Sequence, residues 1–335
     1  ECLNIRRTDT EFMFQVICFY CRYRFRFFEI VSVMCLLPMV LQTKACPAGQ
    51  RSKSFVANNK FSAENINSIV CLLGPYRNLS TLTASIAALH PNCQVLNHAG
   101  EKILNNDSLD FFSNYSSIKF NSFLDYAIEL SGGGERGRKG GSILFSHAFD
   151  NSAMMALYSK RFGKNLIKDH INSVLWKESL ILSNHLVKNR VDLLSLVKKN
   201  SKIKFLLPIR NVFDCVYSNL NTGLGQIYPE IEKNSSFKDL LSVILNDYLK
   251  FFQAKKTCPD NFFHFYENQF EIETLKEFCK FAKLTYDKDW ANDAMSIFSI
   301  KSKYSATLKE KEVYVSLVND LFSDYPEEKK SLLSF

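Results

Sequence analysis

The sequence lacks several features that would assign it at once to a familiar class of protein. It has no run of about 20 apolar residues, the length that a membrane span needs. Its ten cysteines include one closely spaced pair, Cys18 and Cys21, with no second pair and no paired histidines at zinc-ligand spacing, so no metal site is expected. The phosphate-binding pattern G-x-x-x-x-G-K-[ST] is also missing, which disfavours an ordinary nucleoside triphosphatase.

The chain also has little excess charge for its length. A net charge of +8 over 335 residues is modest, and it is not concentrated as in a nucleic-acid-binding protein. Nucleic acid is therefore not an expected partner, although the positive excess favours anionic ligands. The hydrophobic content of 46% and the charged content of 23% are typical of globular proteins, so a folded core is expected.

Residues 1–60 are predicted to lie outside the folded domain. Within 27–41, an apolar run that follows several arginines is too short for a membrane span but has the length of a signal-peptide core. It is interpreted as a signal anchor, as a cleaved signal, or as a segment upstream of the true start, and we favour the last. We accordingly expect a cytoplasmic protein; a single-pass type II membrane protein is the alternative if 27–41 is a genuine anchor.

From residue 61 to residue 335 the pattern predicts one α/β domain. Continuous apolar strands alternate with segments that are apolar at helical spacing, which indicates a mainly parallel central sheet between two layers of helices, a three-layer sandwich. The predicted strands are residues 69–73, 94–97, 142–145, 174–176, 203–209 and 262–266. The predicted helices include residues 79–89, 111–130, 191–197, 240–252, 272–283 and 308–322.

The loop after the first strand carries anion-binding side chains. Arg77 supplies a permanent charge, and Ser80 and Thr81 supply hydroxyl groups at the start of a helix. The N–H groups at a helix start have no partner within the helix, and the helix dipole adds partial positive charge, so an anion fits there. A plain capped turn with a solvated arginine is the alternative interpretation.

A second strand-to-helix turn repeats this arrangement. Arg210 directly follows the strand at 203–209, and Asp214 and Ser218 come four and eight residues later on one face of a helix. Ser218 and Arg210 are predicted to bind one phosphate while Asp214 orients Arg210. The alternative is a salt bridge between Arg210 and Asp214 without a ligand.

In this order and spacing the two segments resemble the sulfotransferase family, over roughly residues 69–270. That family binds 3′-phosphoadenosine-5′-phosphosulfate (PAPS), with a loop [RK]-S-G-T-T on the 5′-phosphosulfate and a motif R-N-P-x-D-x-x-x-S on the 3′-phosphate. The resemblance places the loop residues Arg77, Asn78, Leu79, Ser80 and Thr81 on the 5′ end of the donor. It places the residues Arg210, Asp214 and Ser218 on the 3′ end. Leu79 stands in place of glycine and Val212 in place of proline, and the implied fold is P-loop NTPase-like.

Three residues are candidates for the chemistry of sulfuryl transfer. His147 is similar to the base of cytosolic sulfotransferases, and Glu178 is the rival base because carbohydrate-modifying members use a glutamate. Lys177 lies in a block that resembles a lysine-containing block of bacterial members and is expected to hold the transferred sulfuryl oxygens. The pair Asn97 and His98 also ends a strand and is a candidate for touching the substrate.

The resemblance implies a PAPS-dependent sulfotransferase that needs no metal. Its acceptor would be a hydroxyl or an amine on a carbohydrate or small metabolite. A P-loop-type small-molecule kinase and a non-catalytic sulfotransferase-like binding protein are the alternatives. The basic, glycine-rich loop at 131–141 and the lysines Lys301 and Lys303 are further candidates for contact with an anion, although a solvated role is favoured for each.

Overall fold

The computed structural model describes residues 65–300, 302 and 304–335. The predictions for residues 1–60, including the segment 27–41, and for Lys301 and Lys303 lie outside these residues. Among the helices that the structure describes, none is both long enough and apolar enough to cross a bilayer.

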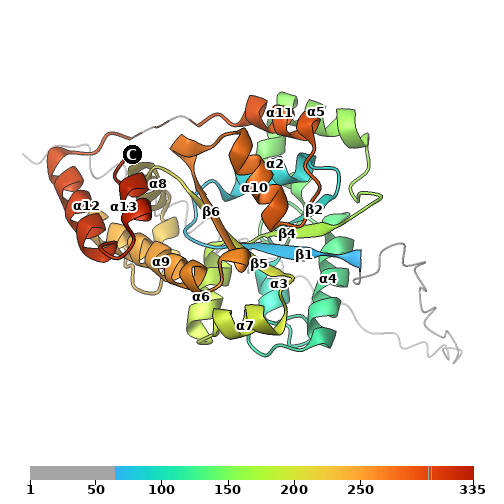
Figure 1. Ribbon diagram of the computed structural model, residues 1–335, viewed down its shortest axis with the longest axis horizontal. Helices are drawn as coiled ribbons and strands as arrows, with labels where there is room; N and C mark the ends of the chain where they lie inside the picture. The colour runs from blue at the N-terminus through green and yellow to red at the C-terminus, as the bar shows by residue number, and fades with distance from the viewer. Residues whose placement is uncertain (1–64, 301, 303) are drawn as a thin grey trace, which may run out of the picture. The chain divides into compact units, whose positions relative to one another are not determined.

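A six-stranded sheet forms the centre of the domain, in the order β3-β2-β4-β1-β5-β6 (Figure 1). All neighbouring strands are parallel except the pair of β3 with β2. The strands are β1 (Ser68–Leu72), β2 (Cys93–Asn97), β3 (Gly141–Ser142), β4 (Ser173–Lys177), β5 (Ile203–Ile209) and β6 (Phe262–Tyr266). The predicted fold class, a mainly parallel sheet within an α/β domain, is confirmed.

Helices cover both faces of the sheet, because β1 presents apolar side chains in both directions. Ile69 and Cys71 belong to one buried cluster, and Val70 and Leu72 belong to the other. The first cluster packs under α3 (Gly100–Leu104), α4 (Ser117–Ser131), α6 (Leu180–Lys188), α7 (Leu193–Lys199), α8 (Val212–Thr222), α9 (Phe237–Thr257), α12 (Leu308–Leu321) and α13 (Pro326–Leu332). The second packs under α2 (Ser80–Leu89), α5 (Ser152–Phe162), α10 (Ile272–Phe281) and α11 (Lys288–Ile297).

Two predicted elements differ from the structure. The strand predicted at 142–145 is reduced to β3, which pairs with only two residues of β2. The side chain of Ser142 then accepts the N–H of Leu144 and starts the 3₁₀ turn η3 (Ile143–Phe145). The helix predicted at 111–130 begins at Ser117 because Ser116 caps it by accepting the N–H of Lys119.

Candidate functional site

The loops after β1, β4 and β5 meet at one edge of the sheet. β1 lies between β4 and β5, and all three run parallel, so their carboxyl ends are neighbours. Ligands of open α/β sheets bind at this edge, where the strand order reverses. A cavity of about 390 Å³ lies there, lined by Tyr76, Arg77, Leu79, Ser80, Thr81, Leu82, His98, Gly137, Arg138, His147, Lys177, Ser179, Arg210 and Leu224.

The wall of this cavity is strongly cationic. Four of its side chains are permanently or ordinarily charged, namely Arg77, Arg138, Lys177 and Arg210, and no carboxylate stands among the described residues that line it. A cavity lined by one sign of charge concentrates ligands of the opposite sign. The site therefore suits a ligand with several negative charges.

The first predicted anion loop forms part of this wall. Helix α2 begins at Ser80, so Ser80 and Thr81 are its first two residues, and both line the cavity. The residue before the helix, Leu79, has φ 62° and gives no side-chain cap. The first N–H groups of α2 lie at the end of the helix that carries partial positive charge.

Left-handed backbone is concentrated in the two loops beside the cavity. Outside glycine, the described residues contain six positions with positive φ, and four of them are Arg77, Leu79, His98 and Ala99. Such conformations cost about 1–3 kcal/mol each and gather at ligand sites. Leu79 thus holds the backbone shape that glycine favours, although it carries a side chain.

The strain at Leu79 gives a prediction for stability. Leu79→Gly and Leu79→Ala remove nearly the same side chain, but only alanine keeps a Cβ in the left-handed region. We expect the glycine variant to be more stable than the alanine variant by about 1 kcal/mol, the reverse of their usual order in a helix. Urea unfolding of the two variants measures this difference, and equal stabilities would contradict the strain.

Asn78 lies in the core and not on the cavity wall. Its side chain is 1% exposed and joins the first loop to the end of β5. The Nδ2 group donates to the carbonyl of Pro208, and Oδ1 accepts the backbone N–H of Arg210 at 2.9 Å and the hydroxyl of Tyr248 at 3.2 Å. Asn78, predicted to bind the donor, is therefore placed to position Arg210 against the first loop.

Arg210 is held by acidic groups and by the first loop. Arg210 precedes α8, and its Nη2 lies 3.3 Å from the carboxylate of Asp214 in the first turn of that helix, while its Nε lies 3.9 Å from Glu267. Its Nη1 donates to the carbonyl of Arg77 at 3.4 Å. Asp214 is fully buried and also accepts the N–H of Tyr304, so it orients Arg210 from beneath the cavity wall.

The two predicted anion sites touch each other. The Nε of Arg77 donates to the hydroxyl of Ser218 at 2.8 Å. Ser218 itself is 4% exposed and lies behind the wall that Arg77 forms. Arg77 is exposed, so its guanidinium remains accessible to a ligand in the cavity. The loops therefore form one continuous cationic surface.

His98, which is half-buried on the cavity wall, contacts the buried residues Lys177 and Glu178. The Nζ of Lys177 lies 3.0 Å from Nε2 of His98, and Nδ1 of His98 lies 3.6 Å from the carboxylate of Glu178. Glu178 also accepts the N–H of Gly100 at 3.1 Å and does not reach the cavity wall. Burial disfavours the ammonium of Lys177 and lowers its pKa to about 8.

His147 lines the cavity from an unexpected element. It begins the 3₁₀ turn η4 (His147–Asp150), whereas the sequence places it at the end of a strand. Burial and the charges of Lys177 and Arg77 lower the pKa of His147, so the neutral imidazole is favoured. The side chain is only partly buried, so it is accessible from the cavity that it lines.

One arginine of the basic loop reaches the cavity. Arg136 forms an ion pair with Asp150, and Lys139 forms one with Glu135. Arg138, between them, lines the cavity wall beside Gly137. The sequence of the loop does not indicate which of its basic side chains faces the cavity.

Local sequence patterns assign little or no role to several other residues of the site. Tyr76, Ser179 and Arg138 line the cavity, and His98 contacts both Lys177 and Glu178. In the sequence, only the position of His98 at the end of a predicted strand indicates a role. In the structure, β4 pairs with β2 and sets Lys177 opposite Asn97, which brings His98 next to Lys177.

The solved structures that align with this chain include three sulfotransferases. Mouse sulfotransferase SULT7A1, complexed with PAP, is 8% identical and aligns over 82% of this chain and 90% of its own, with a TM-score of 0.41. Sulfotransferase STF9 from Mycobacterium avium is 11% identical over 78% and 76%, with a TM-score of 0.39. A sulfotransferase from Alicyclobacillus acidocaldarius is 12% identical over 80% and 96%, with a TM-score of 0.34. No protein-family model and no curated protein matches the sequence.

Proposed function

We propose that the protein is a sulfotransferase that transfers a sulfuryl group from PAPS to a hydroxyl or amine acceptor. The observation that carries the proposal is the cationic cavity, in which the loop after β1 and the end of β5 share contacts through Arg77, Ser218 and Arg210. PAPS has anionic groups at two separated positions, and these two loops supply a donor set for each. The acceptor class, a carbohydrate or small metabolite, follows from the family resemblance.

In this proposal, each of the two loops binds one end of the donor. Arg77, Ser80, Thr81 and the start of α2 bind the 5′-phosphosulfate, because a helix start and a guanidinium together favour an anion. Arg210, held by Asp214, binds the 3′-phosphate, with Ser218 holding Arg77 in place. Bound PAPS supplies an activated sulfuryl group, whose transfer requires a base for the acceptor proton and positive charge near the departing oxygen.

His98 and Lys177 are positioned for these two tasks. The lysine ammonium can only donate, so Nε2 of His98 accepts and Nδ1 carries the proton toward Glu178. An anionic donor attracts the Lys177 ammonium and leaves Nε2 of His98 able to take the acceptor proton. Glu178 stabilises the imidazolium that results. His147, at the mouth, is the competing base.

A ligand-induced thermal shift tests the donor. Adenosine 3′,5′-bisphosphate at about 100 times its Kd is expected to raise the free energy of unfolding of the full chain by about 2.7 kcal/mol. ATP with magnesium is the matched control. A shift with magnesium and ATP, but none with the bisphosphate, would favour the kinase instead. A shift with the bisphosphate but no transfer to any acceptor would indicate a non-catalytic binding protein.

Substituting each histidine in turn tests which of the two is the general base. His98→Gln is expected to lower kcat by about 10²–10⁴-fold, the usual contribution of general base catalysis. His147→Gln, which keeps a polar side chain at the mouth, is expected to lower it less than tenfold. Initial rates with saturating PAPS decide between them, and the opposite order would assign the base to His147.

The pH dependence of the rate reports on Lys177. Because the pKa of Lys177 is about 8, its ammonium is present below pH 8 and is lost above it. We therefore expect kcat/KM for PAPS to fall as the pH rises through about 8, since kcat/KM reports the groups of the free enzyme. In Lys177→Arg the charge persists, and the fall should disappear from that range. An identical alkaline limb in both proteins would exclude Lys177 as its source.

A further inference from the structure

The last strand of the sheet borders a second cavity. β6 pairs with β5 over Phe205↔Phe262 to Ile209↔Tyr266, and in the described sheet its other edge has no partner strand. A cavity of about 640 Å³ runs along that edge, and all five residues of β6 line it. It shares no lining residue with the candidate active site.

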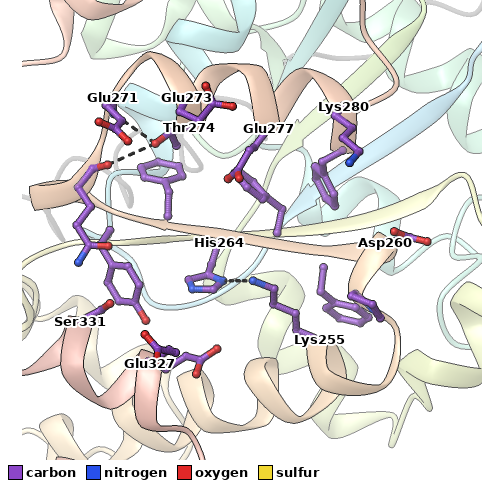
Figure 2. A pocket seen from close by; sticks show the side chains of 18 of the residues that line it. Lys255, Asp260, His264, Glu271, Glu273, Thr274, Glu277, Lys280, Glu327 and Ser331 are labelled. Atoms are coloured by element: carbon purple, nitrogen blue, oxygen red, sulfur yellow. Dashed lines mark hydrogen bonds between the residues drawn. The ribbon is translucent and has the colours of Figure 1, made fainter.

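The cavity has the shape of a slot with the strand at its base. Figure 2 shows Glu277 and Lys280 of α10 on one side of β6, and Lys255 of α9 and Glu327 of α13 on the other. The side chains of Phe262, Phe265 and Tyr266 are buried on either side of the sheet. The slot therefore exposes the backbone edge of β6 between two helical walls.

The strand itself carries none of the features that usually block such an edge. Natural sheet edges are protected by proline, by lysine, by bulges or by a covering element. The sequence of β6 is Phe-Phe-His-Phe-Tyr, without proline or a charged residue. The nearby lysine, Lys255 of α9, directs its Nζ to the side chain of His264, 3.0 Å from Nδ1. An aromatic edge of this kind favours pairing with another strand.

The walls of the slot are acidic, although the whole chain is basic. Its lining includes six carboxylate residues and only three lysines. The carboxylates are Asp260, Glu271, Glu273, Glu277, Glu327 and Glu328. The chain as a whole has a net charge of +8. Glu277 and Glu328 lie on opposite walls; burial lowers the pKa of Lys255, and these two carboxylates partly oppose that effect.

We propose that this slot binds an extended basic segment of a partner protein, which adds to the sheet as a seventh strand beside β6. Successive side chains of a strand point to opposite faces. A lysine- or arginine-rich strand would thus face Glu277 on one wall and Glu328 on the other. Main-chain hydrogen bonds supply affinity in this mode of recognition, and the side-chain contacts supply specificity. A second copy fits less well, because pairing two β6 edges brings two acidic rims together.

The test uses the full chain and a fluorescent heptapeptide in which pairs of adjacent lysines alternate with pairs of valines, so that lysines point to both walls. We expect saturable binding by fluorescence anisotropy, and slower amide hydrogen exchange in residues 262–266 when the peptide is bound. Glu277→Lys, at an exposed position, should weaken binding at least about tenfold. Glu129→Lys on α4, also exposed but packed near β2, is the matched control and should not weaken it.

Two N-methylated peptides separate strand addition from simple charge attraction. Methyl groups on alternate amides block one edge of the peptide and leave the other able to pair, whereas methyl groups on every amide block both edges, so the first peptide should bind and the second should not. Equal binding of both peptides, or no change in exchange at 262–266, would overturn the proposal. Sedimentation showing a dimer that Glu277→Lys changes would overturn it in favour of a second copy.

Discussion

Lys177→Met is expected to lower the rate of sulfuryl transfer by about 10²–10³-fold, the loss typical of removing one preorganised charge-stabilising donor. Lys177 is 5% exposed, and its ammonium lies against His98 on the cavity wall. Methionine has nearly the same length and tolerates burial, so the fold should survive. Transfer from PAPS to a panel of hydroxyl and amine acceptors measures the effect.

The same variant should bind adenosine 3′,5′-bisphosphate almost normally. That ligand lacks the sulfuryl group, and a lysine that acts on the transferred group contributes little to its binding. A rate loss with unchanged bisphosphate affinity would place the contribution of Lys177 in the transition state. Equal losses in rate and affinity would show instead that Lys177 only binds the ground state.

Arg210→Met is expected to reduce the affinity for adenosine 3′,5′-bisphosphate by about 100-fold, because a guanidinium forms forked, charge-assisted hydrogen bonds with a phosphate. It should also destabilise the fold by about 3 kcal/mol, since the fully buried carboxylate of Asp214 loses its guanidinium. Isothermal titration and urea unfolding measure the two effects separately.

A double variant distinguishes a direct loss of phosphate binding from a loss of affinity caused by the destabilised fold. In Arg210→Met combined with Asp214→Asn, the buried charge disappears, and the asparagine oxygen still accepts the N–H of Tyr304. We expect stability to return toward that of Asp214→Asn alone while the bisphosphate affinity stays low. Recovery of affinity in the double variant would show that Arg210 acts on the fold and does not bind the phosphate.

Local patterns were sufficient to predict much of this domain. The strands at 203–209 and 262–266 lie where their apolar runs predict. Asp214 and Ser218 both lie on α8, four residues apart as predicted, and the start of α2 follows from the apolar repeat that begins at Leu79. Each of these features depends on residues that are near one another in the chain.

The prediction for His147 shows where local patterns fail. The apolar residues before it are equally consistent with a strand and with a 3₁₀ turn, and the structure has the turn. Similarly, Asn78 has the polarity of a ligand-binding residue, yet its side chain bridges Pro208 and Arg210 in the core. A polar side chain in a loop does not itself indicate which way it points.

Local patterns predict the arginines that follow β1 and β5, the hydroxyls at the start of α2 and the mainly parallel sheet. Which strand ends are neighbours depends on the tertiary structure alone. By placing β4 beside β2, with Asn97 opposite Lys177, it brought His98 against Lys177 and Glu178, which are about 80 residues away in the chain. Strand order arises from packing of the helices on both faces and leaves no periodic signal within any one strand. The same order leaves the acidic edge of β6 without a partner strand in the described domain.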